Sequence, residues 1–132
     1  MAGWSSRPEM LGSSDLVAFV GTADAVHAKH FYGDVLGLPL ESESEFAVVF
    51  KAPGTTLRVT VVERVQPAPY TVLGWGVEDI VAAIADLHER GVKFAQFDGV
   101  EQDELGIWKS PGGAQVAWFK DPDGNLLSIT QD

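Results

Sequence analysis

Apolar and polar positions along this chain predict one series of elements twice. A short apolar run at residues 16–20 is followed by Asp24 and a helical pattern. A second apolar run at residues 71–75 is followed by Asp79 and another helical pattern. A repeat of this kind indicates two similar structural units within one domain.

Each predicted helix has a recognisable start and end. Asp24 and Asp79 are expected N-caps, because a short carboxylate accepts hydrogen bonds from the free N–H groups of the first turn. Gly37 and Gly91 stand where a left-handed residue closes a helix. The apolar positions between them recur at helical spacing. They are Ala28, Phe31, Tyr32 and Val35 in the first helix and Ile80, Ala83, Ile84 and Leu87 in the second.

Strands with Pro and Gly turns follow both helices, which is typical of hairpins. On the strand near Arg58, alternation places Leu57, Val59 and Val61 on one face. Thr56, Arg58 and Thr60 then share the more polar face. We predict an α+β fold: two βαβββ modules forming a curved mixed sheet around a cleft. The expected organisation is an N-terminal flexible arm (1–14), a first module (15–66), a linker (67–69) and a second module (70–132). Trp4 and Met10 of the arm could dock onto a partner chain.

Composition excludes several classes of function. The chain has 132 residues, enough for a single domain, and a formal net charge of −10 without a basic stripe, so we expect no nucleic-acid partner. No apolar run approaches the roughly 18 residues of a membrane helix, and the N-terminus does not resemble a signal peptide. We therefore expect a cytoplasmic protein that does not bind membranes. Cysteine is absent, which excludes disulfides and thiolate chemistry.

Some polar groups imitate functional sites. His27 and His30 lie on one helix, but they point away from its apolar stripe and indicate a solvated surface. Asp103 and Glu104 lie in a predicted loop and could serve as a base only if that loop folds over the cleft. His88, near the end of the second helix, is expected to be structural. No nucleophile–base pair stands out, so catalytic residues stay unassigned.

Two further motifs have structural alternatives. Asp121, Asp123 and Asn125 begin like a calcium loop, but a strand follows, which favours a turn. Gly74 and Gly76 should face the cleft with Val72, while Trp75 between them faces the helix. The missing side chains either leave room for a ligand or mark a bulge.

Three segments carry a resemblance to a known family. Residues 24–38 include Phe-Tyr and end in Leu-Gly-Leu, residues 77–80 read Val-Glu-Asp-Ile, and residues 118–125 contain Asp-Pro-Asp-Gly-Asn. Over roughly residues 15–131 the chain resembles the vicinal-oxygen-chelate superfamily, which includes glyoxalases, bleomycin resistance proteins and extradiol dioxygenases. The resemblance implies a divalent metal held by His, Gln or Glu from the first and last strands of each module.

The implied ligand positions fall on Val17, Arg58, Val72 and Ser128. Two valines, an arginine and a serine do not form a metal site, and Arg58 adds a permanent positive charge. We therefore expect no metal and no cofactor. The resemblance then favours the metal-free members of the superfamily, such as drug-sequestering resistance proteins.

A site for a small organic ligand is what remains. Aromatic walls with a few polar groups suit planar amphipathic molecules, although some of these aromatic residues could equally fill the core. The expected ligand-binding residues are Phe19, Arg58, Thr60, Trp108, Trp118 and Ser128.

We expect a metal-independent small-molecule-binding protein of the glyoxalase/bleomycin-resistance type, sequestering a drug or metabolite as a homodimer, rather than an enzyme. One alternative is a metal-dependent lyase, isomerase or dioxygenase of the same superfamily, if the strand registration differs. The other is a metal-free enzyme that uses a loop carboxylate together with Arg58.

Overall fold

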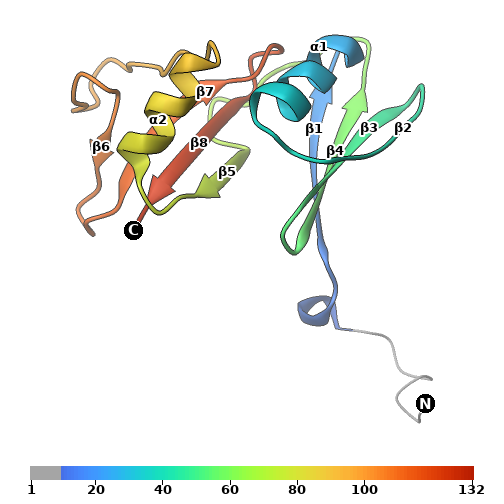
Figure 1. Ribbon diagram of the computed structural model, residues 1–132, viewed down its shortest axis with the longest axis horizontal. Coiled ribbons are helices and arrows are strands. Elements are labelled where there is room, and N and C mark those ends of the chain that lie inside the picture. The colour runs from blue at the N-terminus through green and yellow to red at the C-terminus, as the bar shows by residue number, and fades with distance from the viewer. Residues whose placement is uncertain (1–9) are drawn as a thin grey trace.

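The computed structural model describes residues 10–132, and its two halves follow the same order of elements (Figure 1). A short 3-10 helix, η2 (Leu11–Ser13), precedes the first half and lies apart from both sheets. The first half contains β1 (Leu16–Thr22), α1 (Ala25–Lys29), the π-helix η3 (His30–Val35), β2 (Leu40–Glu43), β3 (Ala47–Ala52) and β4 (Thr55–Val61). The second half contains β5 (Leu73–Gly76), α2 (Ile80–Glu89), β6 (Trp108–Lys109), β7 (Gln115–Lys120) and β8 (Leu126–Gln131). Of the predicted arm, residues 1–9 with Trp4 lie outside the described residues.

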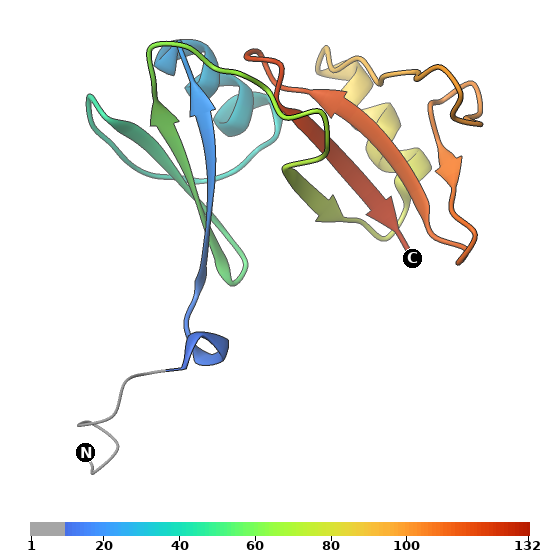
Figure 2. The same ribbon diagram turned by 180° about the vertical axis from the view of Figure 1, so that it is seen from behind.

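The strands form two four-stranded mixed sheets with the same topology. Their orders are β1-β4-β3-β2 and β5-β8-β7-β6, and in each sheet the first strand runs parallel to the last. The α+β class and the two βαβββ modules are thereby confirmed. The sheets do not join into one continuous curved sheet, because no strand pairing connects them (Figure 2). β1 and β5 are consequently edge strands.

Local signals set the ends of both helices. The Asp24 carboxylate accepts a hydrogen bond from the backbone N–H of His27 at 3.1 Å, and Asp79 caps α2 in the same way. Gly37 and Gly91 adopt the predicted left-handed conformation, with φ of 80° and 93°. The predicted N-caps and terminal glycines are therefore confirmed.

The first helix differs from the prediction in its second part. After Lys29 the chain widens into η3, where the N–H of Leu36 bonds to the carbonyl of Phe31, five residues earlier. Gly33 lies in this widened turn, and a Cβ built on it would be 3.4 Å from the ring of Phe50. The apolar spacing fits an ordinary helix equally well, so the extra residue in the turn has no signature in the periodic pattern.

A single hydrophobic core joins the halves. Phe119 of β7 is almost fully buried, and its ring centroid lies 6.4 Å from that of Phe31 in the other half and 5.4 Å from that of Phe94. Trp75 stacks on the same ring at 6.4 Å, which places it on the helix side of its sheet. The helix-covered faces of the two sheets therefore turn toward a common interior, and the opposite faces lie outside.

Hydrogen bonds from the turn at residues 121–125 also join the halves. The buried Tyr32 hydroxyl donates to Asp121 Oδ2 at 2.6 Å, and the buried Thr22 hydroxyl donates to Asp123 Oδ2 at 2.6 Å. Within the turn, Asp121 Oδ1 accepts the backbone N–H groups of Asp123 and Asn125, both at 2.9 Å. The segment is a turn, as predicted, and its carboxylates are engaged by protein donors.

Candidate functional site

The outer face of the first sheet is formed by alternate residues of β1 and β4. Phe19 lies opposite Arg58 in the parallel pair, while Leu57 and Val59 point into the core and are buried. Phe19 is 62% exposed and Arg58 is exposed, whereas Thr60 is half-buried. Strand parity therefore predicted this face correctly.

One end of this face is covered by the chain itself. A Cβ built on Gly21 would lie 3.4 Å from Val62 and 3.7 Å from Val65, both of which follow β4. The end that carries Val17 and Phe19 stays open. Accessible contacts for a ligand thus concentrate near Phe19 and Arg58.

The outer face of the second sheet is aromatic. Trp118 of β7 lies opposite Ser128 of β8, and its ring centroid is 6.0 Å from that of Trp108 on β6. Phe97 meets Trp118 edge-on at 5.7 Å, and the Trp118 indole N–H donates to the Thr71 hydroxyl at 3.1 Å. The structure therefore brings three of the predicted ligand residues into one surface.

Two glycines of β5, Gly74 and Gly76, lie on the outer face of the same sheet as this aromatic cluster. Gly74 lies opposite Ser128, and a Cβ built on Gly74 would be 2.6 Å from the Ser128 hydroxyl oxygen. Nothing lies within 4 Å of a Cβ built on Gly76. Gly74 is thus closely packed against Ser128, whereas Gly76 leaves open surface.

The four positions to which the family resemblance assigns metal ligands are equivalent in the two sheets. Phe19 pairs with Arg58 in the first sheet, and Gly74 pairs with Ser128 in the second. Val17 lies two residues before Phe19 and Val72 lies two residues before Gly74, so these two valines occupy equivalent positions. These side chains offer a single hydroxyl as a ligand oxygen, which does not fit a divalent cation. Across residues 10–132, no three His, Asp or Glu side chains gather closely enough to hold a metal ion.

The predicted ligand residues fall into two sets. Three lie on the first sheet (Phe19, Arg58 and Thr60), and three lie on the second (Trp108, Trp118 and Ser128). Since both outer faces lie away from the common core, one chain does not bring the two sets into one cleft. Sequence reasoning missed Phe97 and Thr71, which lie outside the strands and carry no periodic signal.

A loop between α2 and β6 is held by the side chain of Gln102. Its amide donates to the carbonyls of Ala95 and Gly106 at 3.0 and 2.8 Å and accepts the N–H of Phe97 at 2.8 Å. Asp103 Oδ1 accepts the N–H of Ile107 at 2.9 Å. This carboxylate therefore has a structural role, although the sequence presented it as a possible base.

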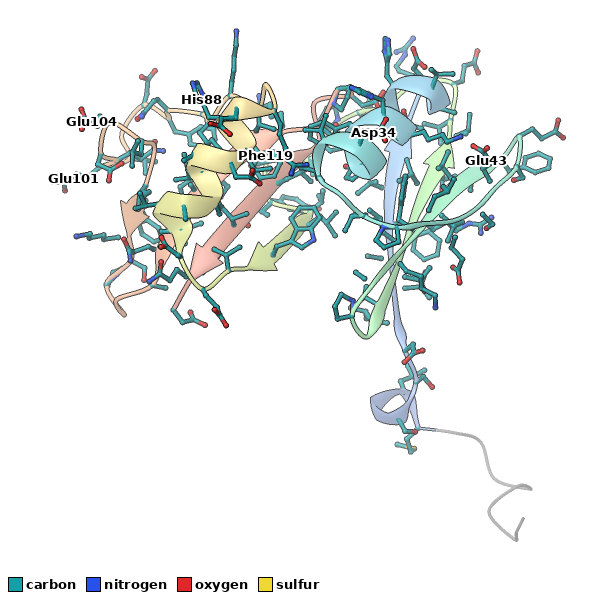
Figure 3. All side chains as sticks on the ribbon, in the orientation of Figure 1. Asp34, Glu43, His88, Glu101, Glu104 and Phe119 are labelled. Carbon is teal, nitrogen blue, oxygen red and sulfur yellow. The ribbon has the colours of Figure 1, made fainter. Side chains whose placement is uncertain are left out.

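Beside this loop lies a hollow of about 600 Å³ at the outer end of the second half, between α2 and residues 93–105. His88 and Glu104 stand on its two sides (Figure 3), and Ile84, Phe94 and Leu105 form apolar walls. His88 of α2 thus borders this hollow, which lies on the helix side and apart from the two sheet faces.

The histidines of α1 and η3 have separate partners. His27 Nδ1 lies 3.0 Å from Asp24 Oδ2, and His30 Nδ1 lies 3.0 Å from Asp34 Oδ2. All four side chains are exposed. They form two surface pairs, in agreement with the expectation of a solvated helix face. No helix of residues 10–132 is both long enough and apolar enough to cross a membrane.

Comparisons with known proteins agree with this geometry. The model of the Glyoxalase/Bleomycin resistance protein/Dioxygenase superfamily matches residues 15–129. An uncharacterized protein of Bacillus subtilis (strain 168), YraH, is 35% identical over 115 residues, which cover 75% of this chain and 83% of that protein.

Solved structures share the fold. A superfamily member from Sphaerobacter thermophilus has a TM-score of 0.71 at 24% identity, with 91% of this chain and 98% of that chain covered. A lactoylglutathione lyase from Agrobacterium tumefaciens has a TM-score of 0.65 at 17% identity, with 90% and 93% covered. The chain belongs to the glyoxalase/bleomycin resistance protein/dioxygenase superfamily.

Proposed function

We propose that this protein is a metal-independent small-molecule-binding protein that sequesters a drug or metabolite on the outer faces of its sheets. The observation that carries the proposal is the donor set at Val17, Arg58, Val72 and Ser128, which suits an organic ligand and does not suit a divalent ion. The aromatic surface of Trp108 and Trp118 adds the kind of wall that planar ligands use. Its place in the cytoplasm stays a prediction.

We further propose that a second copy of the chain completes the site. β1 is an edge strand of seven residues with exposed apolar side chains, Leu16 at 66% and Phe19 at 62%. Such an edge invites pairing with another strand, and natural proteins cover it. A homodimer can place the first sheet of one subunit against the second sheet of its partner, so that both sets of ligand residues line one cleft.

The ligand and metal claims can be tested together. Purified protein is analysed for bound metals and then screened by thermal shift against a mixed library of cationic drugs, neutral aromatics and carboxylates, before and after chelation with EDTA. We expect substoichiometric metal and at least one stabilising compound whose effect survives chelation. A stoichiometric divalent metal whose removal abolishes ligand binding would refute the metal-independent function.

The dimer is tested by sedimentation of the native protein and of Leu16→Glu, which places a charge on the exposed edge of β1. We expect the native protein to be dimeric and the variant to dissociate. Val26→Glu is the matched control, because Val26 is 77% exposed on α1, away from this edge. A monomeric native protein, or a dimer indifferent to Leu16→Glu, would contradict this assembly.

A further inference from the structure

The outer face of the first sheet carries an exposed cation whose neighbours are apolar or bear hydroxyl groups. Arg58 lies opposite Phe19 on one side and opposite Val49 on the other. Thr56 and Thr60 come before and after it on the same face of β4. The residues that surround Arg58 on this face therefore carry an aromatic ring, an aliphatic side chain and two hydroxyl groups.

Arg58 makes no ion pair within the part of the chain that the structure describes. Among residues 10–132, no carboxylate oxygen lies within 4.0 Å of the Arg58 guanidinium. Lys51, the other basic strand residue on this face, is paired with Glu41 at 3.4 Å. The whole chain has a formal charge of −10, so Arg58 is a cation on a molecule whose net charge is negative. Arg58 therefore offers an anion a local partner, although the net charge of the chain is unfavourable to anions.

The chemistry of these groups favours one class of ligand. A guanidinium presents a planar fork of N–H donors that matches both oxygens of a carboxylate. The neighbouring Phe19 side chain is 62% exposed and offers an aromatic surface for stacking. A cationic ligand would instead meet the positive charge of Arg58 without a compensating acid.

We propose that this face recognises planar aromatic carboxylates, with Arg58 binding the carboxylate and Phe19 stacking on the ring. The inference rests on the small-molecule-binding function proposed above and assigns it a ligand class. Thr56 and Thr60 add hydroxyl groups beside the carboxylate position.

The test uses three probes of one shape and different charge: 2-naphthoate, 2-naphthamide and 2-naphthylmethylammonium. Their affinities are measured by calorimetry on the full-length protein. We expect native protein to bind the carboxylate about tenfold or more tightly than the amide, as a charge-assisted bidentate contact provides. Arg58→Gln should abolish this preference, and Arg58→Lys should keep part of it, because an ammonium retains the charge without the fork.

Two further variants separate the roles of charge and ring. Phe19→Ala should weaken all three probes by a similar factor and leave the carboxylate preference in place. Arg64→Gln removes an exposed arginine that follows β4, and it should leave every affinity unchanged. Circular dichroism of each variant checks that the fold is intact, which we expect because Arg58 is exposed.

The result that would overturn the proposal is a native protein that binds the amide or the ammonium as tightly as the carboxylate, or that binds none of the probes at millimolar concentration. An Arg58→Gln variant that keeps the carboxylate preference would overturn it as well. These outcomes leave the broader binding function standing if the thermal-shift library yields another ligand. If neither the probes nor the library bind, both proposals fail.

Discussion

The first half of the molecule, β1 to β4, and the second half, β5 to β8, share one topology and the same helix caps, and they differ in the shape of the helix and in the chemistry of the outer face. The first half widens its helix into a π-turn and presents a cation on its outer face, whereas the second has a regular α2 and an outer face of tryptophans. The turn before β8 bonds to the other half, through Tyr32 and Thr22. The comparison teaches that core-facing positions and helix caps preserve the repeat, while the outer faces are free to diverge.

The strongest way to break this arrangement is Asp121→Ala. The buried Asp121 carboxylate accepts bonds from the Tyr32 hydroxyl and from two backbone N–H groups of its turn, so its loss leaves several donors unpaired. We expect destabilisation of roughly 3 kcal/mol or more, measured by urea unfolding. Asp86→Ala, at an exposed position on α2, should change stability by less than about 0.5 kcal/mol. Equal effects of the two variants would show that the turn does not hold the halves together.

The glycines of β5 provide a matched pair on the second sheet. Gly74→Ala forces a Cβ to within 2.6 Å of the Ser128 hydroxyl oxygen, and overpacking of this kind costs about 1–3 kcal/mol. Gly76→Ala meets nothing within 4 Å and should be neutral to within about 0.5 kcal/mol, or slightly stabilising. Thermal unfolding of both variants measures the difference. If Gly76→Ala were the more damaging, the outer surface beside it would not be open as described.

Alkaline pH should lower the free energy of unfolding through Tyr32. Burial, and then the nearby Asp121 carboxylate, raise the pKa of the Tyr32 hydroxyl above its usual 10.0. The folded state therefore keeps a proton that the unfolded chain releases above about pH 10, so stability falls as pH rises, by about 1.4 kcal/mol per pH unit for this group. Urea unfolding at about pH 9 and about pH 11 measures the slope.

Tyr32→Phe should flatten that slope while lowering stability near neutral pH, since Asp121 loses a donor. Tyr70→Phe, at a residue that is 66% exposed, is the control and should leave the slope unchanged. A slope that persists in Tyr32→Phe would assign the alkaline instability to other groups.

The helix caps offer the smallest and most symmetric comparison. Asp24→Ala and Asp79→Ala each remove a carboxylate that accepts a first-turn N–H, and each should cost about 1 kcal/mol. Asp24→Asn and Asp79→Asn keep an acceptor oxygen and should recover most of that loss. Chemical unfolding gives all four values. A cost confined to one helix would mean that the caps are not equivalent across the repeat.

Much of the fold could be predicted because the repeat shows in the spacing of the apolar core residues and in the helix caps. The alternation of Leu57 and Val59 with Arg58 fixed the faces of β4, and Asp24 and Asp79 fixed both helix starts. These signals are local, so one sequence is enough to detect them. The widening of the helix into η3 was not predictable, because one extra residue in a turn leaves the apolar spacing almost unchanged.

For the candidate site, the sequence could predict which face of a strand a side chain lies on, but not how the two sheets are arranged. Strand alternation put Arg58 and Thr60 on one face of β4, and only the structure pairs Phe19 with Arg58 and Trp118 with Ser128. Alternation could not show how the two sheets are oriented, since that depends on packing between Phe31 and Phe119, far apart in the chain. Nor does any local pattern mark Gln102 as the residue that organises its loop.

Because the two halves share one core, the chain cannot be cut into two independently folding fragments. If the polypeptide were cut between Pro67 and Pro69, each fragment would expose to water the rings that now meet across the middle, Phe31 from one and Phe119 from the other. Neither fragment would fold stably alone, yet a mixture of the two could associate and bury that apolar surface again. The two repeated halves therefore fold as one unit. A substitution in the core of one half is tolerated only if it still packs against the core residues of the other half.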